Sequence, residues 1–308
     1  MTLTELRYIV AVARERHFGR AADACFVSQP TLSVAIRKLE EELKTQIFER
    51  TNTEVAMTSL GALIVDQAQR VLEEANSLKH LAKHGQDPLS GPLRLGAIYT
   101  IAPYLLPSLV RVARKELPNV PLFLEENFTV RLLEMLRQGA LDCVVIAEPF
   151  ASAGLNQIDL YDEPFLVAVP KGHPWEERKS IPHRELKEQN TLLLGTGHCF
   201  RDHVLGVCPE LNRLGSGSTI GEQRSFEGSS LETIRQMVAS GIGISVMPRT
   251  SATDVVTPDQ LIRYIPFEDP IPTRRVCLVW RKNFPRSAAM TKLAEVIRQC
   301  ALPGVSYI

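Results

Sequence analysis

A cysteine flanked by histidine and arginine is the most chemically suggestive feature of the sequence. It lies in Gly197-His198-Cys199-Phe200-Arg201-Asp202-His203, and Cys208 follows nine residues after it. The thiolate is the reactive form of cysteine, and cationic neighbours or helix N-terminal dipoles favour it. A peroxide converts a thiolate to sulfenic acid, which condenses with a second thiol to a disulfide. The spacing therefore predicts redox chemistry at Cys199, with Cys208 as the candidate partner.

A bond between these two cysteines places a demand on the chain between them. A disulfide needs Cα atoms within about 7 Å, so segment 200–207 must bend to close it. If the two residues lie far apart when reduced, closing the bond must remodel the segment. That remodelling would be the switch.

A metal site is the alternative use of the same segment. Four residues could supply ligands, namely His198, Cys199, His203 and Cys208. Their spacing lacks the paired Cys-x₂₋₄-Cys pattern of common zinc sites, so we expect neither a metal nor a cofactor. The remaining cysteines are interpreted as small buried hydrophobes in a helix, two strands and the final helix: Cys25, Cys143, Cys277 and Cys300.

Composition limits the class of protein that carries these residues. The chain has 308 residues, 44% of them hydrophobic and 23% charged, with a formal net charge of zero. Such a chain can form about two globular domains, and its balanced charge favours no particular partner. No apolar run reaches the roughly 20 residues of a membrane span, and the N-terminus does not resemble a signal peptide. We therefore expect a cytoplasmic protein without a membrane partner.

The N-terminal region has the pattern of a helix-turn-helix. Thr2 and Glu5 have the spacing of a capping box, which predicts a first helix after Thr2. A small-residue helix over 19–25 and a third helix from the N-cap Ser28 to Leu43 follow. Residues 47–50 and 54–57 are predicted strands around a turn at 51–53.

The second helix of such a motif enters the DNA major groove with its N-terminus first. Its exposed early residues would then meet bases and phosphates: Ser28, Gln29, Thr31, Ser33, Arg37 and Lys38. Glutamine can pair bidentately with adenine, and serine or threonine can contact base or phosphate. The alternative is a small helical bundle in which Ser28 is only an N-cap.

One long helix over 59–84 is predicted next. Apolar residues recur along it at heptad-like spacing: Leu60, Ile64, Ala68, Val71, Ala75, Leu78 and Ala82. That spacing is typical of a helix that pairs with another helix. Residues 85–92, rich in glycine and proline, are predicted to form a hinge.

The remaining chain alternates short apolar strands with amphipathic helices, which predicts an α/β fold. The strands are predicted at 93–97, 122–125, 143–147, 165–169, 191–194, 242–247 and 276–280. The helices are predicted at 103–116, 130–138, 230–240 and 287–300.

Three motifs together resemble the LysR-type transcriptional regulators. They are His17-Phe18-Gly19-Arg20-Ala21-Ala22, Val27-Ser28-Gln29-Pro30-Thr31-Leu32-Ser33, and Leu39-Glu40 through Phe48-Glu49-Arg50. The resemblance implies an α+β winged helix-turn-helix over 1–58, a dimerising linker helix and hinge over 59–87, and a regulatory domain over 88–308. That domain would be periplasmic-binding-protein-like and two-lobed, with lobes of about 88–162 plus 270–308 and 163–269. The resemblance adds Arg20, Pro30 and Arg50 to the expected DNA contacts. The predicted wing at 51–54 has no Lys or Arg.

The segment around Cys199 is similar to that of the peroxide-sensing branch of this family. In that branch the equivalent of Cys199 is peroxidatic and the equivalent of Cys208 resolves it. Other positions bind or polarise peroxide there, which implies that role for Thr100, Thr129, His198, Asp202 and Arg201. Without the resemblance, Thr100 and Thr129 would both be interpreted as helix or strand-end caps. A basic residue near Arg274-Arg275 is also expected to contribute, and the sequence does not decide between the two.

The resemblance implies a DNA-binding activator, not an enzyme, that responds to hydrogen peroxide and controls oxidative-stress genes. Its expected partners are double-stranded promoter DNA, RNA polymerase, and the glutathione and thioredoxin systems, with homodimers assembling into a homotetramer. Two alternatives remain. One is a LysR-type regulator of a small metabolite bound between the lobes, and the other is a thiol peroxidase with an appended DNA-binding module.

Overall fold

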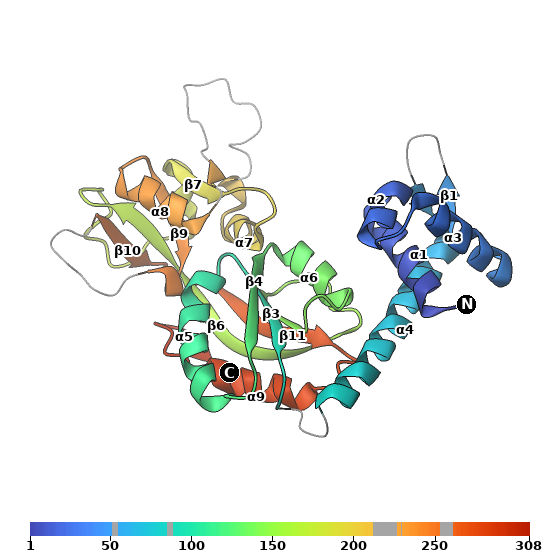
Figure 1. Ribbon diagram of the computed structural model, residues 1–308. Coiled ribbons are helices and arrows are strands. Elements are labelled where there is room, and N and C mark those ends of the chain that lie inside the picture. Colours follow the sequence, from blue (N-terminus) through green and yellow to red (C-terminus); the bar gives the residue numbers. More distant parts are fainter. Residues whose placement is uncertain (51–54, 85–88, 212–226, 229, 253–260) are drawn as a thin grey trace. The chain divides into compact units, whose positions relative to one another are not determined.

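The computed structural model describes residues 1–50, 55–84, 89–211, 227–228, 230–252 and 261–308. The chain forms two compact units, Met1–Gln86 and Asp87–Ile308 (Figure 1). No helix in the described ranges is long and apolar enough to cross a membrane.

Three short helices begin the N-terminal unit, and the predicted caps are confirmed. In α1 (Leu3–Glu15) the Thr2 and Glu5 side chains each accept a hydrogen bond from the other residue's backbone N–H. His17 Nδ1 caps α2 (Phe18–Ala24) by accepting from two backbone N–H groups. Ser28 caps α3 (Gln29–Leu43), whose second residue is Pro30, where a missing N–H costs nothing.

Strands β1 (Phe48–Arg50) and β2 (Val55–Met57) pair antiparallel, and α4 (Ser59–His84) follows. The turn predicted at 51–53 lies outside the described residues, as do residues 85–88 of the predicted hinge. Two members of the predicted heptad seam, Ile64 and Ala68, pack into the core of the N-terminal unit instead. Leu60, Val71 and Leu78 remain exposed on α4. Part of the seam therefore stabilises the N-terminal unit. The exposed part forms an apolar face on α4 that is available to pair with another helix.

One mixed sheet runs through the second unit, in the strand order β4-β3-β5-β11-β6-β9-β7-β8, with β10 and β12 also paired to β6. Six of its strands are β3 (Leu93–Ile98), β4 (Leu122–Asn127), β5 (Cys143–Ala147), β7 (Thr191–Leu194), β8 (Glu227–Gly228) and β9 (Ile244–Pro248). The others are β6 (Leu155–Pro170), β10 (Ile262–Pro266), β11 (Thr273–Arg281) and β12 (Ser306–Tyr307).

The longest strand, β6, was only partly predicted. The sequence indicated 165–169, where apolar residues are continuous, whereas β6 begins at Leu155. Its first half carries polar residues because it pairs with β11 and β12 on a partly exposed part of the sheet. Its second half pairs with β9 and β10 and is buried.

Two hydrophobic cores lie along this sheet. The first core takes residues from 93–161 and 276–302 and includes α5 (Ala102–Glu116), α6 (Thr129–Arg137) and α9 (Ser287–Arg298). The second core takes residues from 165–267 and includes α7 (Cys199–Val207) and α8 (Leu231–Ala239). Strand β6 passes from one core to the other, so it ties them together (Figure 1).

Helix α7 was not predicted, although it contains the reactive segment. Its nine residues include Gly206 and the β-branched Val204 and Val207, which weaken a helical pattern. Burial of Phe200 and Val204 in the second core stabilises the helix where its intrinsic propensity is low.

Candidate functional site: a cysteine at a helix N-terminus

Cys199 is the first residue of α7. The preceding Gly197 has φ of 100°, a conformation that side-chain-bearing residues rarely adopt, and it turns the chain into the helix. His198 occupies the N-cap position without a side-chain capping hydrogen bond. The half-buried Cys199 therefore lies at the positive end of the helix dipole.

A small cavity of about 10 Å³ opens beside Cys199. That volume is about the space of one water-sized molecule. Its lining comes from the ends of β3 and β4 and from the start of α7: Ile98, Tyr99, Thr100, Asn127, Phe128, Thr129, Gly197, His198 and Cys199. Four of the sequence-predicted residues thus meet here, namely Thr100, Thr129, His198 and Cys199.

Thr129 brings an unused hydrogen-bonding group to the cavity. Its Oγ1 is buried and has no hydrogen-bond partner among the described residues. Capping does not explain it, because Thr129 is the first residue of α6 and the N-cap is Phe128. A buried hydroxyl without a hydrogen-bond partner lowers the stability of a protein. A ligand that forms a hydrogen bond with Thr129 Oγ1 removes this penalty, which favours its binding.

Thr100 reaches the cavity from the end of β3 and is held by a buried arginine. Arg274 Nη1 donates to Thr100 Oγ1 at 2.7 Å, and Nη2 donates to the Thr100 carbonyl at 2.9 Å. The same guanidinium pairs with Glu163 at 2.7 Å, both side chains being fully buried. Glu163 also accepts from the backbone N–H of Thr250 at 2.8 Å and from its hydroxyl.

The adjacent arginine, Arg275, pairs with other carboxylates. Arg275 pairs with Asp162 at 2.9 Å and with Asp159 at 3.3 Å, and its side chain is 41% exposed. Its pKa is raised, chiefly by the hydrogen bond with Asp162. Of the two candidates that the sequence left open, Arg274 is therefore the one connected to a residue of the cavity.

Aromatic rings surround the cavity. The buried His198 ring meets Phe128 edge-on, with centroids 4.8 Å apart, and lies 6.1 Å from Tyr99. Phe128 and Tyr99 are themselves 5.2 Å apart. His198 is the buried member of this cluster, whereas Tyr99 and Phe128 are partly exposed at the rim of the cavity.

Two residues expected to bind peroxide lie away from the lining. Asp202 is exposed on α7. Arg201 directs Nη1 to the carbonyl of Leu194 at 2.8 Å. The direction of the side chains around a helix separates both from the cavity, although they are close to Cys199 in sequence.

Cys208 lies at the opposite end of α7, where it is the C-cap. Nine residues at 1.5 Å per residue separate the two Cα atoms by about 13 Å, nearly twice the reach of a disulfide. Cys208 is fully buried in the second core, and its Sγ donates to Glu210 Oε2 at 3.5 Å. Burial, and then Glu210, raises the pKa of this thiol.

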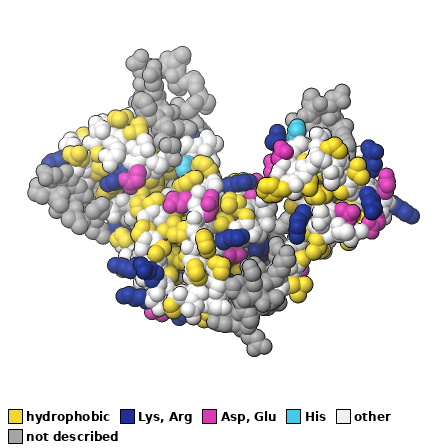
Figure 2. Space-filling model, in the orientation of Figure 1, with side chains coloured by type: hydrophobic (Ala, Val, Ile, Leu, Met, Phe, Trp, Pro, Cys, Tyr) yellow, Lys and Arg dark blue, Asp and Glu magenta, His cyan; other side chains and the backbone are white. Residues whose placement is uncertain are grey.

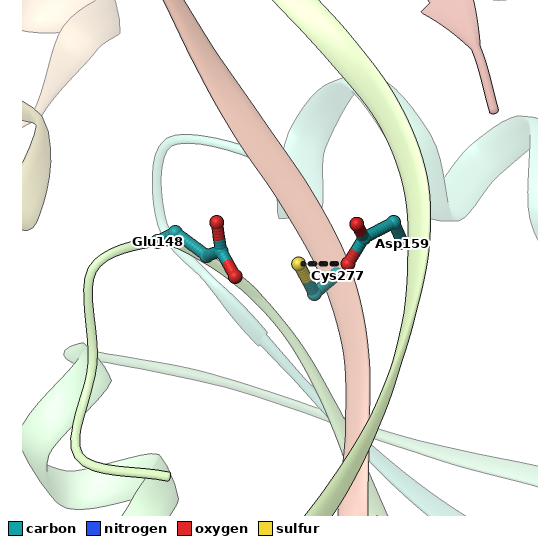
Figure 3. Close-up of side chains that lie close together, drawn as sticks. All are labelled: Glu148, Asp159 and Cys277. Atoms are coloured by element: carbon teal, nitrogen blue, oxygen red, sulfur yellow. Dashed lines mark hydrogen bonds between the residues drawn. The ribbon is translucent and has the colours of Figure 1, made fainter.

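The four residues of the alternative metal site do not form a common cluster. Within the described ranges, the group of metal-binding side chains that does come together is Glu148, Asp159 and Cys277 (Figure 3). Cys277 Sγ donates to Asp159 at 3.4 Å, and burial raises its pKa. This thiol was predicted to lie among apolar neighbours, and no local pattern indicated that the carboxylates of Glu148 and Asp159 would face it.

The other three cysteines fit their predicted role with small differences in position. Cys143 lies in β5 and is fully buried. Cys25 follows α2 as its C-cap and is partly buried, and Cys300 follows α9 rather than lying in it. All six cysteines, which lie in the described part of the chain, are free thiols.

Helix α3 presents a polar face of the kind expected of a recognition helix. Gln29, Pro30, Thr31, Arg37 and Lys38 are exposed on it, together with Ser28 at its cap. Figure 2 shows basic side chains on the N-terminal unit interspersed with acidic ones, so placement rather than net charge distinguishes this face.

Two other expected DNA contacts, Ser33 and Arg20, have a different environment. Ser33 is partly buried, and Arg20 Nη2 donates to the Glu15 carbonyl at 2.7 Å. The side chain of Arg50 lies outside the described residues. Val34 was not among the predicted residues, although it is 69% exposed on the polar face of α3. Its position one turn after Pro30 was the available signal.

Comparisons with known proteins agree with this architecture. Residues 3–62 match the helix-turn-helix domain of the lysR family of bacterial regulatory proteins, and residues 86–301 match the LysR substrate binding domain. The DNA-binding transcriptional dual regulator OxyR of Escherichia coli K12 is 41% identical over 298 residues, covering 97% of this chain and 95% of the relative.

Solved structures give the same result. A full-length OxyR variant from Pseudomonas aeruginosa has a TM-score of 0.74 at 48% identity, covering 98% of this chain and 96% of that one. A reduced form of OxyR from Neisseria meningitidis has a TM-score of 0.66 at 46% identity, covering 71% of this chain and all of that one. The predicted fold class is confirmed: a winged helix-turn-helix, a long linker helix and a periplasmic-binding-protein-like α/β regulatory domain. The chain belongs to the LysR family of bacterial transcriptional regulators, in the group formed by its OxyR members.

Proposed function

We propose that this regulator is a thiol switch in which hydrogen peroxide oxidises Cys199 and Cys208 then closes a disulfide. One observation carries the proposal: Cys199 begins α7 beside a water-sized cavity that also receives the unpartnered hydroxyl of Thr129. Hydrogen peroxide has hydrogen-bond donors and acceptors on both oxygens, as a ligand of the Thr129 hydroxyl needs. The homologues named as hydrogen peroxide-inducible genes activators support the same reading.

The first chemical step is attack by the Cys199 thiolate on one peroxide oxygen. The S–O bond forms, the O–O bond breaks, and the departing hydroxide takes a proton to leave as water. Thr129 and Thr100 are placed to bond the two oxygens, and Arg274 acts through Thr100 by fixing the direction of its hydroxyl. Donors aimed at the departing oxygen stabilise the charge that develops on it.

The second step joins the two cysteines. The Cys208 thiolate attacks the sulfenic sulfur of Cys199, the S–S bond forms, and hydroxide leaves and is protonated to a second water. Two thiols and one peroxide thus give one disulfide and two waters. Because the cysteines stand about 13 Å apart at the two ends of α7, the helix must unwind before this step.

Unwinding of α7 would carry the signal. Phe200, Val204 and Cys208 belong to the second core, whereas Cys199 packs against the first. Removing this helix from between the cores changes the packing of the regulatory domain, and we propose that subunit contacts and the spacing of the DNA-binding heads change with it. The proposed lobes are 88–162 plus 270–308 and 163–269.

The DNA-binding half of the proposal rests on α3. Dimers pairing through the exposed face of α4 would place two such helices on half-sites about one helical turn apart. A homotetramer on promoter DNA, contact with RNA polymerase, and resetting by the cytoplasmic glutathione and thioredoxin systems complete the proposed cycle. Recycling would be slow, as suits a regulator rather than a peroxidase.

The metabolite alternative is less favoured at this site. The relatives of this chain are named hydrogen peroxide-inducible genes activators, which favours peroxide over an organic metabolite as the signal. The peroxidase alternative predicts many turnovers with thioredoxin, which a turnover assay would reveal.

A non-reducing peptide map tests the switch. Purified full-length protein is treated with stoichiometric hydrogen peroxide, alkylated and digested. We expect a new Cys199–Cys208 linkage, with the other four cysteines still alkylated. A free Cys199 thiol after treatment would contradict the proposal.

A further inference from the structure

We propose that His203 is a positioning residue that holds α7 in its helical, thiol-state form and thereby sets how readily Cys199 and Cys208 form their disulfide. The inference rests on the proposed thiol switch and concerns a hydrogen bond in the middle of the helix that must unwind.

His203 connects α7 to the segment that follows β5. Its Nε2 lies 2.6 Å from the carbonyl oxygen of Glu148. A carbonyl can only accept, so Nε2 carries the proton and Nδ1 is unprotonated. Glu148 directly follows β5 of the first core, whereas the apolar residues of α7 belong to the second core. The bond therefore adds a second contact between α7 and the first core, beside the packing of Cys199.

The accepting end of this bond is firmly fixed. The Glu148 backbone N–H donates to the Arg275 carbonyl of β11 at 3.0 Å. Its carboxylate accepts from Gln157 at 2.9 Å and lies close to Asp159 and Cys277 (Figure 3). A rigid acceptor makes the hydrogen bond sensitive to the position of α7, because Glu148 is not free to follow a moving helix.

The ring of His203 packs against aromatic side chains, and one of its two nitrogens is buried without a hydrogen bond to a described residue. Its centroid lies 6.3 Å from Phe165 and 6.4 Å from Phe200. Nδ1 is buried without a hydrogen-bond partner among the described residues. Burial lowers the pKa of this imidazole, and the nearby Arg274 acts in the same direction. The neutral tautomer that donates to Glu148 is thus favoured.

A phenylalanine would fill the same space without an unpartnered nitrogen. The feature that a histidine adds is the Nε2 donor, and its acceptor is the carbonyl oxygen of Glu148. When α7 unwinds to bring Cys199 and Cys208 together, His203 leaves this acceptor. The bond accordingly stabilises the thiol form and opposes the disulfide by about two- to tenfold in the equilibrium constant.

Redox titration of the full-length protein in glutathione buffers tests this role. His203→Phe keeps the ring and removes the donor. We expect its thiol–disulfide equilibrium to move toward the disulfide by about two- to tenfold, which makes the midpoint potential more negative by about 9 to 30 mV. His203→Gln retains an N–H donor at similar reach and should stay within about twofold of wild type. His173→Gln is the matched control, because His173 pairs with Gln189 and not with α7.

A spectroscopic readout separates the hydrogen bond from packing. ¹⁵N-histidine NMR should show His203 as the Nε2–H tautomer in the thiol form, and this signal should change when the disulfide forms. An unshifted potential in His203→Phe, or an equal shift in His203→Gln, would overturn the inference. A disulfide that forms in glutathione but not with peroxide would remove only the peroxide part of the proposed function. Failure to form in either would overturn the switch and, with it, the inference.

Discussion

Arg274 donates to Thr100 Oγ1 over 2.7 Å while its guanidinium is paired with Glu163, and no part of the Arg274 side chain meets solvent. The Arg274 guanidinium therefore orients the hydroxyl of Thr100 at the cavity, and Glu163 neutralises the charge of that guanidinium. Phe200 adds a ring face 5.1 Å from the same guanidinium, which connects Arg274 to α7 as well. A residue of the reacting helix, a cavity hydroxyl and a buried ion pair thus depend on one another.

Breaking this ion pair should destabilise the fold. Glu163→Gln leaves Arg274 buried without its countercharge, and we expect the free energy of unfolding to fall by about 3–5 kcal/mol. Urea unfolding of the thiol form measures it. Glu134→Gln removes an exposed pair with Arg131 and should change stability little. Equal losses in both variants would mean that the buried pair has no special weight.

The hydroxyl of Thr129 should matter for peroxide and not for the thiol in general. Thr129→Val keeps the shape and removes the unpartnered oxygen. We expect oxidation of Cys199 by hydrogen peroxide to slow by roughly 10²-fold, as for other lost donors at a developing charge. Alkylation by iodoacetamide, which needs no such donor, should keep its rate. Stopped-flow oxidation beside alkylation kinetics makes the comparison, and parallel loss of both rates would argue for a change in the thiolate itself.

Much of this site was readable from residue types, because Cys199 and Cys208 carry their chemistry in their spacing. The strands around them were predicted where apolar residues are continuous, as in β5 and β7. The contact between Arg274 and Thr100 was not predictable, since it joins residues 174 positions apart, one in β11 and one after β3, two strands that both pair with β5. Only the folded sheet shows which of two adjacent arginines points inward.

Helix α7 was missed for a related physical reason. Its intrinsic propensity is weak, and it is helical because Phe200 and Val204 are buried in a core assembled from distant strands. The same weakness suits a segment that must unwind. Local sequence indicates the reactive cysteine, whereas its separation from Cys208 is a tertiary property.

A glycine inside α7 offers a direct test of that unwinding. Gly206 is helical, and a Cβ added there would meet nothing within 4 Å. Gly206→Ala should stabilise the helix by about 0.5–1 kcal/mol. The thiol form gains this stability, so the midpoint potential should become less negative by about 10 to 20 mV. Glutathione titration measures it, and an unchanged potential would show that α7 stays helical in the disulfide form.

The Cys208 thiol should make stability depend on pH. Burial raises its pKa above the ordinary value of 9.0. The folded protein therefore favours the neutral thiol, and that contribution is complete below pH 9 and is lost as pH rises through the folded pKa. Unfolding free energies of reduced protein should fall as the pH rises above 9.0, and less steeply in Cys208→Ser. An identical slope in that variant would assign the loss to other groups.

The exposed face of α3 makes the final prediction, and it concerns DNA. Arg37 lies about two turns from the helix start and is exposed, so its side chain can reach phosphate or a base edge. If it contacts phosphate, Arg37→Ala should weaken binding about equally on all operator variants and lower the salt slope by about one, in both redox states. If it contacts a base, the loss should be about 1–3 kcal/mol and confined to sequences that carry that base. Salt-dependent fluorescence anisotropy on an operator and its variants distinguishes the two outcomes. Glu41→Gln on the same helix, an acidic residue that binds neither phosphate nor a guanine edge, supplies the control, because a general loss of helix structure would affect both variants alike.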